Sequence, residues 1–341
     1  MTPAAPRVSV LMSVREGAFL RPAVETLRAQ TLTDAEFVLV DDASDPDTAA
    51  LLDAYARDEP RVRLIRRARS HGLATALNEG LAACRAPLVA RADADDEYHP
   101  ERLARQVAEM NARPALGVLS CGWDRIDAKG RVIARVTPVR GSSRLAFRHL
   151  FGSQLLHPGV VYRRDLVLAA GGYDPAYWTA QDTELWGRLF ERTQIDNLPD
   201  RLVRWRRHGA SITGSRGRAG QKLSAGLSRR HLSAYTGAPL SRQAALAAAQ
   251  VWRGEAVSLA RTRLGLRTLR TVRRAAWRRD EPHERIDLTL RVVRALTERA
   301  LAERALAERA ADGAGRQALP LLAMSARWLA GGLVRRPEAT A

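Results

Sequence analysis

The sequence predicts an α/β fold in which a mostly parallel sheet is flanked by helices, with an α-helical extension at the C-terminal end. Over residues 7–91, short β-branched runs alternate with stretches that place apolar residues three and four positions apart. This alternation is typical of parallel strands joined by crossover helices. After Gly209 the composition shifts to Ala, Leu and Arg, which have high helix propensity and therefore predict the extension.

Each element follows from one such run. In the first part, strands are expected over 8–14, 37–41, 62–66 and 88–91, with helices over 20–30, 47–57 and 73–84. From Pro100 the order is looser, with a helix over 101–111, a strand over 116–121, a hairpin at 128–130, a further segment over 145–151, a strand over 160–162, a helix over 182–192 and a strand over 202–207. In the extension, helices are expected over 240–259, 264–279 and 283–311, followed by an amphipathic stretch over 320–336.

The bulk composition excludes several classes of protein. With 341 residues, 46% of them hydrophobic and 27% charged, the chain has a globular composition, and no uncharged run reaches the ~20 residues that a membrane-spanning helix needs. No secretory signal precedes the first apolar run, and two cysteines cannot make a disulfide framework. We therefore expect a cytoplasmic protein.

The positive charge is concentrated in one part of the chain. Of the net charge of +18, residues 216–341 hold 25 Lys and Arg against 10 Asp and Glu, an excess of +15. We therefore expect two parts, an α/β domain over 1–215 and a basic, Arg- and Ala-rich helical region over 216–341. The basic region could attract an anionic membrane surface, an acidic polymer or nucleic acid. Because nearly all of its charge is Arg, a bias in genomic base composition explains it equally well.

Acidic residues follow two of the predicted strands. Asp42 follows the second strand, and Asp93, Asp95 and Asp96 follow the fourth. In open α/β sheets, ligands bind beyond the carboxyl ends of the strands, so these acids should share one edge. Three packed carboxylates repel one another unless a cation neutralises them, and Mg²⁺ or Mn²⁺ commonly bridges carboxylates and phosphate oxygens. The cluster indicates a metal-bound diphosphate, with a solvated acidic turn as the alternative.

A series of motifs resembles, in order and spacing, the family 2 glycosyltransferases of GT-A fold, which have a Rossmann-like sheet. On the nucleotide side these are the segments 8–12, 40–44, 72–80, 90–96 and 100–103. On the acceptor side they are the segments 157–160, 172–174, 181–186 and 206–209. The resemblance covers residues 7–215, and nothing beyond Gly214 is recognised.

The resemblance implies inverting transfer of a sugar from a nucleotide-diphosphate sugar to a hydroxyl of a glycan, polysaccharide or lipid-linked acceptor, assisted by Mn²⁺ or Mg²⁺. Asp42 matches the acid that binds the nucleotide base, Asp93 lies nearer the ribose, and Asp95 is the expected metal ligand. Asp182 matches the catalytic base, which must reach the attacking hydroxyl opposite the leaving group. Other residues matched to the donor and metal sites are Ser13, Arg15, Gly72 and His208.

Three positions depart from the family pattern or admit an alternative. Arg15 stands where many members carry an aromatic that stacks on the base, and a guanidinium can also stack there. Gln181 replaces the usual Glu before Asp182. Asp182 could instead be the N-cap of its helix, in which case Glu184 is the reserve base.

Four ring-bearing side chains have both a functional and a structural interpretation. His208 matches a segment near the metal or diphosphate, although a lone histidine is often a structural hydrogen-bonding group, which is the role we expect for His157. Trp186 lies inside a predicted helix and is expected in the core, whereas Trp178 lies in a loop and could stack on an acceptor sugar.

Three classes of function remain. The first is a glycosyltransferase. A nucleotidyltransferase would need a Gly-rich, basic phosphate loop after the first strand, which residues 15–17 do not provide. The third is a non-catalytic protein whose basic region binds nucleic acid, but that region has no zinc-ligand spacing or known nucleic-acid motif. For the enzyme, we expect the basic region and its end at 320–336 to contact an anionic inner-membrane surface.

Overall fold

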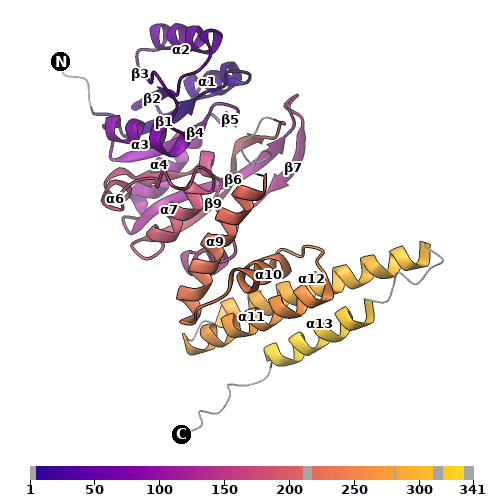
Figure 1. Cartoon of the computed structure of the whole chain (residues 1–341). Helices are drawn as coiled ribbons and strands as arrows, with labels where there is room; N and C mark the ends of the chain where they lie inside the picture. Colours follow the sequence, from indigo (N-terminus) through magenta and orange to yellow (C-terminus); the bar gives the residue numbers. More distant parts are fainter. Residues whose placement is uncertain (1–4, 210–216, 280–281, 310–317, 334–341) are drawn as a thin grey trace. The chain divides into compact units, whose positions relative to one another are not determined.

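The computed structural model describes residues 5–209, 217–279, 282–309 and 318–333 (Figure 1). Contacts divide the chain into two compact units. The α/β unit contains residues 1–149 and 153–223, and the helical unit contains residues 150–152 and 224–341.

The α/β unit is built on one mixed sheet. In the described residues its strands are β1 (Val8–Val14), β2 (Ala35–Asp41), β3 (Val62–Arg66), β4 (Leu88–Asp93), β5 (Glu97–Tyr98), β6 (Leu116–Ile126), β7 (Val132–Val136), β8 (Val161–Arg163) and β9 (Gln194–Arg206). Their spatial order is β3-β2-β1-β4-β8-β6-β9-β5, with β7 paired to β6. The first four are parallel, as predicted. The α/β class is confirmed, but β5, β7 and β8 pair antiparallel with their neighbours, which makes the rest of the sheet mixed.

The parallel strands end together at one edge of the sheet. In the β1–β4 register Ser13 lies opposite Asp93, and in the β1–β2 register Val14 lies opposite Asp41. The acidic residues that follow β2 and β4 therefore flank the end of β1, where the topology of such sheets places ligands.

Helices cover both faces of this sheet. They are α1 (Leu20–Arg28), α2 (Pro46–Asp58), α3 (Leu73–Ala83), α4 (Arg102–Ala112), α5 (Ser142–His149), α6 (Arg164–Ala169) and α7 (Gln181–Leu189). Successive residues of β1 enter opposite cores: Val10 and Met12 pack with α1 and α4, whereas Leu11 packs with α3 and α7. Burial on both faces explains why β1 reads as an uninterrupted apolar run. A β-carbon on Gly80 would lie 2.3 Å from Cδ1 of Leu11, so this glycine lets α3 approach β1.

Two strands are longer than the apolar runs predict. The strand expected over 116–121 continues into a hairpin with β7, which is present where expected, and the strand expected over 202–207 begins at Gln194. Tertiary partners satisfy the polar residues of the added part. Asp196 accepts a hydrogen bond of 2.8 Å from the backbone N–H of Gly141 and pairs with Arg113 at 2.9 Å. These contacts, rather than a local apolar pattern, stabilise the start of β9.

The helical unit contains only helices among its described elements. They are α9 (Gly217–Thr236, which begins in the α/β unit), α10 (Arg242–Trp252), α11 (Leu259–Arg278), α12 (Pro282–Arg309) and α13 (Ala318–Leu333). α10 packs on α11, and α12 packs on α13. The helix expected over 240–259 ends at Trp252, because the chain turns at Gly254 with φ of +72°. No described helix is both long and apolar enough to cross a membrane.

The end of the helical unit differs from the expected amphipathic surface. α13 covers residues 320–333, and residues 334–336 lie outside the described part of the chain. The side chain of Trp328 is buried, with the Arg273 guanidinium 4.6 Å from its ring centre. Trp328, the one tryptophan of the stretch 320–336, is therefore not exposed to a membrane surface. In α12, Leu296 is buried and Leu301 is exposed, because residues five apart are rotated by about 140° on an ideal helix.

Candidate functional site

Three carboxylates gather where β4 ends. One oxygen from each of Asp93, Asp95 and Asp96 lies within 4.8 Å of the others, close enough to ligate a single cation. Burial and the charge of Asp93 raise the pKa of Asp95, while His208 partly opposes this shift. Burial and the charges of Asp95 and Asp93 raise the pKa of Asp96 well above its ordinary value. A bound divalent ion would relieve this repulsion, so the cluster fits a hard metal ion.

Buried side chains hold Asp93 at the end of β4. Arg91 is fully buried in β4 and forms an ion pair with Asp93 through Nη2. The Tyr98 hydroxyl lies 2.6 Å from the backbone nitrogen of Asp93, whose N–H donates to it, and donates to the Asp93 carbonyl oxygen at 2.8 Å. These contacts fix both the backbone and the side chain of Asp93 at the strand end.

The end of β9 closes the cluster from the other side. His208 Nε2 lies 2.9 Å from Oδ2 of Asp95, and the backbone N–H of Arg206 donates to Oδ1 of Asp96 at 2.7 Å. Oδ2 of Asp96 is buried and has no hydrogen-bond partner among the described residues, so it could ligate a cation. Phe19 contacts both flanking residues: its ring centre is 4.8 Å from the His208 ring and 4.7 Å from the Arg206 guanidinium. Asp96 belongs to the acidic cluster expected from the sequence, and Arg206 lies in the matched 206–209 segment without an expected role, whereas Phe19 was not among the expected site residues.

A second group of residues lies where β1 and β2 end. The buried Asp42 carboxylate forms an ion pair with Arg67 and accepts a hydrogen bond of 2.7 Å from the Ser70 hydroxyl. Arg15 donates to the same hydroxyl at 3.3 Å. Gly72, with φ of +89°, precedes α3 and donates its N–H to the Ser70 oxygen at 3.4 Å. The structure thus brings together Arg15, Asp42 and Gly72 around Ser70.

Asp182 lies in the first turn of α7. The N-cap of this helix is Ala180, with φ of +61°, so the alternative interpretation of Asp182 as the N-cap is wrong. The Thr183 hydroxyl donates to Oδ1 of Asp182 at 3.3 Å. The reserve candidate, Glu184, is buried and forms an ion pair with Arg188 at 2.7 Å. Glu184 is therefore held in a buried ion pair, whereas the side chain of Asp182 is partly exposed.

Tyr173 is close enough to both Asp93 and Asp182 for their charges to affect its hydroxyl. Burial raises the pKa of its hydroxyl, and the charges of Asp182 and Asp93 both add to the shift. Asn78 binds the Tyr173 backbone reciprocally: its Nδ2 donates to the carbonyl oxygen at 2.7 Å, and its Oδ1 accepts from the N–H at 2.8 Å. The Tyr173 hydroxyl lies 3.0 Å from Nε2 of His157. Nothing in the sequence marks this connection, because Asn78 and Tyr173 are far apart in the chain.

The burial of His157, Trp186 and Trp178 agrees with the roles expected for them. Burial and the charge of Arg91 lower the pKa of His157 well below its ordinary value, so this histidine is neutral near pH 7. Its hydrogen bond to Tyr173 supports the structural role. Trp186 is fully buried in the core, whereas Trp178 is 47% exposed.

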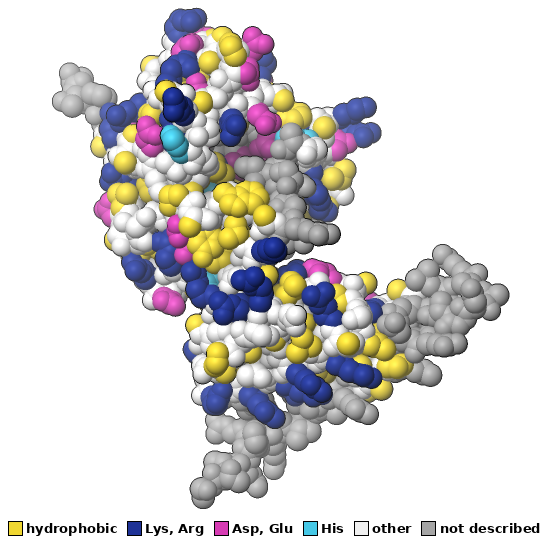
Figure 2. All heavy atoms as spheres, viewed as in Figure 1, with side chains coloured by type: hydrophobic (Ala, Val, Ile, Leu, Met, Phe, Trp, Pro, Cys, Tyr) yellow, Lys and Arg dark blue, Asp and Glu magenta, His cyan; other side chains and the backbone are white. Residues whose placement is uncertain are grey.

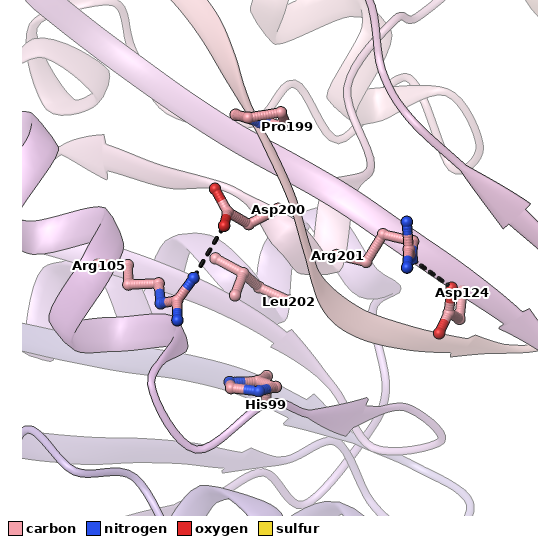
Figure 3. A pocket seen from close by; sticks show the side chains of 7 residues that line it. All are labelled: His99, Arg105, Asp124, Pro199, Asp200, Arg201 and Leu202. Carbon is pink, nitrogen blue, oxygen red and sulfur yellow. Dashed lines mark hydrogen bonds and ion pairs between the residues drawn. The ribbon is translucent and has the colours of Figure 1, made fainter.

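Two surface hollows in the described part of the chain are lined by residues other than these. One, of about 380 Å³, is lined by residues of α4, β6 and β9 (Figure 3). Its charges are already paired: Arg105 binds Asp200 at 2.8 Å and Arg201 binds Asp124 at 3.0 Å (Figure 3). The other, of about 400 Å³, lies between residues 16–18 and the start of α2. Neither contains the carboxylate cluster.

Comparison with curated proteins identifies the family. The model of glycosyl transferase family 2 matches residues 9–166. The O-antigen biosynthesis protein RfbC of Myxococcus xanthus is 32% identical over 216 residues, which are 62% of this chain, but the chain spans only 16% of that protein's length. The amylovoran biosynthesis glycosyltransferase AmsE of Erwinia amylovora is 30% identical over 200 residues, which cover 58% of this chain and 74% of the relative.

Solved structures share the fold. TarS 1-349 of S. aureus in complex with UDP-GlcNAc superposes with a TM-score of 0.57 at 15% identity, covering 97% of this chain and 93% of that one. The mannosyltransferase PcManGT from Pyrobaculum calidifontis, in complex with GDP-Man and Mn²⁺, gives a TM-score of 0.50 at 18% identity, covering 97% and 86%. These neighbours carry the GT-A architecture. With its matching family model, motifs and relatives, the chain belongs to glycosyl transferase family 2 and is a glycosyltransferase.

Proposed function

We propose that the protein is an inverting, metal-assisted glycosyltransferase that moves a sugar from a nucleotide-diphosphate sugar to a hydroxyl of a glycan, polysaccharide or lipid-linked acceptor. The observation that carries the proposal is the carboxylate cluster of Asp93, Asp95 and Asp96, closed by His208. The names of the two curated relatives, which concern O-antigen and amylovoran biosynthesis, support a glycan acceptor.

The donor would lie along the ends of β1, β2 and β4. Asp42 would bind the nucleotide base, with Arg15 stacking on it, and Ser13 and Asp93 would contact the ribose and diphosphate. Gly72 precedes α3, and the backbone N–H groups at a helix start suit an anion. Ser70 joins Arg15 to Asp42, so the two base contacts are held by one hydroxyl.

The metal would be held by Asp95 and His208, with the unpartnered oxygen of Asp96 as a further ligand. Carboxylate oxygens and an imidazole suit Mn²⁺ or Mg²⁺, although imidazole favours the former. When bound, the ion stabilises the negative charge of the departing nucleoside diphosphate as a Lewis acid. The protein's part is to keep the three acids in place: Tyr98 and Arg91 hold Asp93, and the Arg206 backbone holds Asp96.

Asp182 would be the general base. The carboxylate takes the proton of the acceptor hydroxyl as that oxygen attacks the anomeric carbon, and a single displacement inverts the configuration. The Asp182 side chain is partly exposed in the first turn of α7, whereas Glu184 is buried in an ion pair with Arg188. The exposed Trp178, which precedes α7, is the proposed stacking surface for an acceptor sugar.

In this proposal residues 1–215 form the catalytic domain, and residues 216–341 form a basic helical region that contacts an anionic membrane surface. A lipid-linked acceptor would be found at such a surface. Nucleic acid is not proposed as a partner.

Donor screening tests the function. The full chain is mixed with UDP-, GDP- and dTDP-sugars in Mn²⁺, Mg²⁺ or EDTA, and release of nucleoside diphosphate is measured. We expect release with at least one donor, dependent on the metal and lost in Asp182→Asn, while the control Asp200→Asn, in the hollow of Figure 3, keeps the wild-type rate. Release that is equally fast in EDTA would contradict metal assistance, and full activity of Asp182→Asn would contradict its role as the base.

A further inference from the structure

A row of arginines lies along one face of α11. The helix carries seven arginines and no acidic residue. At 100° per residue, five of them fall within an arc of about 80° and span about 22 Å along the axis. We call these five exposed residues the arginine stripe: Arg263, Arg267, Arg270, Arg274 and Arg278. In Figure 2 dark blue side chains recur over the helical unit, and magenta ones are few on the face in view.

The stripe is not neutralised within the described part of the chain. No carboxylate there forms an ion pair or hydrogen bond with any of the five, whereas Arg253 and Arg294, on other parts of the unit, pair with Glu255 at 2.5 Å and with Glu298 at 2.6 Å. Burial, together with the charges of Arg270 and Arg274, lowers the pKa of the neighbouring Arg273. The positive charge of the stripe therefore acts on a partly buried arginine of the same helix.

Apart from a hydrogen bond of 3.5 Å from Arg278 to the carbonyl oxygen of Thr236, no side chain of the stripe bonds to another helix among the described residues. The opposite face of the helix is buried through Leu266, Leu269 and Val272, and contacts α10 and α12. Successive members of the stripe are three or four residues apart, and like charges at that spacing destabilise a helix. An anionic partner along the row would remove this repulsion. The row thus has the properties of a binding surface rather than of a structural face.

We propose that the arginine stripe docks the helical unit on the phosphate head groups of an anionic lipid bilayer. A straight helix lies tangent to a flat surface, so long side chains within one narrow arc can reach the same plane. The unit also exposes Leu290, Leu301 and Leu322, apolar side chains that a lipid interface accommodates.

This inference rests on the proposed function, because a lipid-linked acceptor gives the enzyme a reason to be at the bilayer. It also places the contact differently from the sequence-based expectation. The proposed membrane contact is made by the exposed arginines of α11 and not by the stretch 320–336, in which Trp328 is buried.

Sedimentation with vesicles tests the stripe directly. The full chain is mixed, without donor, with vesicles of phosphatidylcholine alone or with three parts in ten of phosphatidylglycerol, at low and high salt. The test variant is Arg267→Gln/Arg270→Gln/Arg274→Gln. The control is Arg229→Gln/Arg242→Gln/Arg261→Gln, which removes the same charge from exposed positions off the stripe.

We expect the wild type to bind only the anionic vesicles and to be released by salt. Each arginine near such a surface contributes about a fivefold factor in partitioning, so the stripe variant should bind on the order of 100-fold more weakly. The control should lose less than about tenfold. Equal losses in both variants, no binding of the wild type, or binding to a duplex DNA oligomer tighter than to the vesicles would each overturn the proposal.

Donor turnover separates this inference from the proposed function. Nucleoside diphosphate release in solution should be the same in the wild type and both variants. If none of the three proteins releases product, the proposed function fails while the vesicle result still decides the stripe.

Discussion

Replacing Asn78 by Ala removes two hydrogen bonds that join α3 to the backbone of Tyr173. The bonds measure 2.7 and 2.8 Å, and the Tyr173 side chain is fully buried. The substitution leaves a donor and an acceptor of the backbone unpaired, which together costs about 2–4 kcal/mol. Because every 1.4 kcal/mol is a factor of ten, the Tyr173 amide should exchange about 30- to 1,000-fold faster with solvent.

Hydrogen exchange with peptide-level mass spectrometry measures this effect. Asn78→Asp keeps an oxygen that can accept from the Tyr173 N–H but loses the donor to its carbonyl, so the amide should stay protected in Asn78→Asp and lose protection in Asn78→Ala. Asn111→Ala, at an exposed position of α4, is the control and should change nothing.

The same substitution should affect turnover through Asp182. Since the Tyr173 segment leads to α7, its displacement should lower kcat in Asn78→Ala by more than about tenfold, with donor affinity nearly unchanged. If the Tyr173 amide stays protected in Asn78→Ala, the reciprocal pair does not hold this segment and the reasoning is wrong.

Three further predictions concern the proposed chemistry and the stability of the α/β unit. Asp182→Asn should lower kcat by about 10²–10⁴-fold without changing donor affinity, measured by nucleoside diphosphate release, and more than about a tenth of the wild-type rate would place the base elsewhere. Asp95→Ala should abolish the tighter binding of nucleoside diphosphate in Mn²⁺ than in EDTA, as calorimetry would show, and equal wild-type affinity in both buffers would contradict the metal site. Burial opposes the ionisation of Glu36, but hydrogen bonds from Ser9 and Arg85 hold its pKa below 4.5. The ionised Glu36 therefore stabilises the fold above its ordinary pKa, and this stabilisation is lost as the pH falls through the lowered pKa. Glu36→Gln should flatten the decrease in Tm between about pH 5 and 3. An unchanged slope would contradict this assignment.

The sequence was most informative where structure follows from local patterns. β1, β2 and β4 are buried on both faces, so each reads as an apolar run, and the intervening helices carry one apolar face. The acids that follow β2 and β4 were expected at one edge because parallel strands of neighbouring βα units end together. The register of Ser13 with Asp93 confirms that placement.

The sequence was less informative from β6 onward. The start of β9 is held by Asp196 and its partners Gly141 and Arg113, which no periodicity reveals. Trp328 belongs to a stretch whose sequence is amphipathic, yet its side chain is buried in the structure, with the Arg273 guanidinium over its ring. In both cases a contact between distant residues decided the outcome.

The sequence by itself determined the α/β class, the position of the acidic motifs at the strand ends and the concentration of arginine in the last third of the chain. Only the tertiary structure decided which side chains surround those acids. It brought His208 and Arg206 to the cluster, paired Asn78 with Tyr173, and paired Glu184 with Arg188. Strand and helix periodicities are set by neighbours in the sequence, whereas these contacts depend on how the whole chain packs, and a local pattern carries no record of that packing.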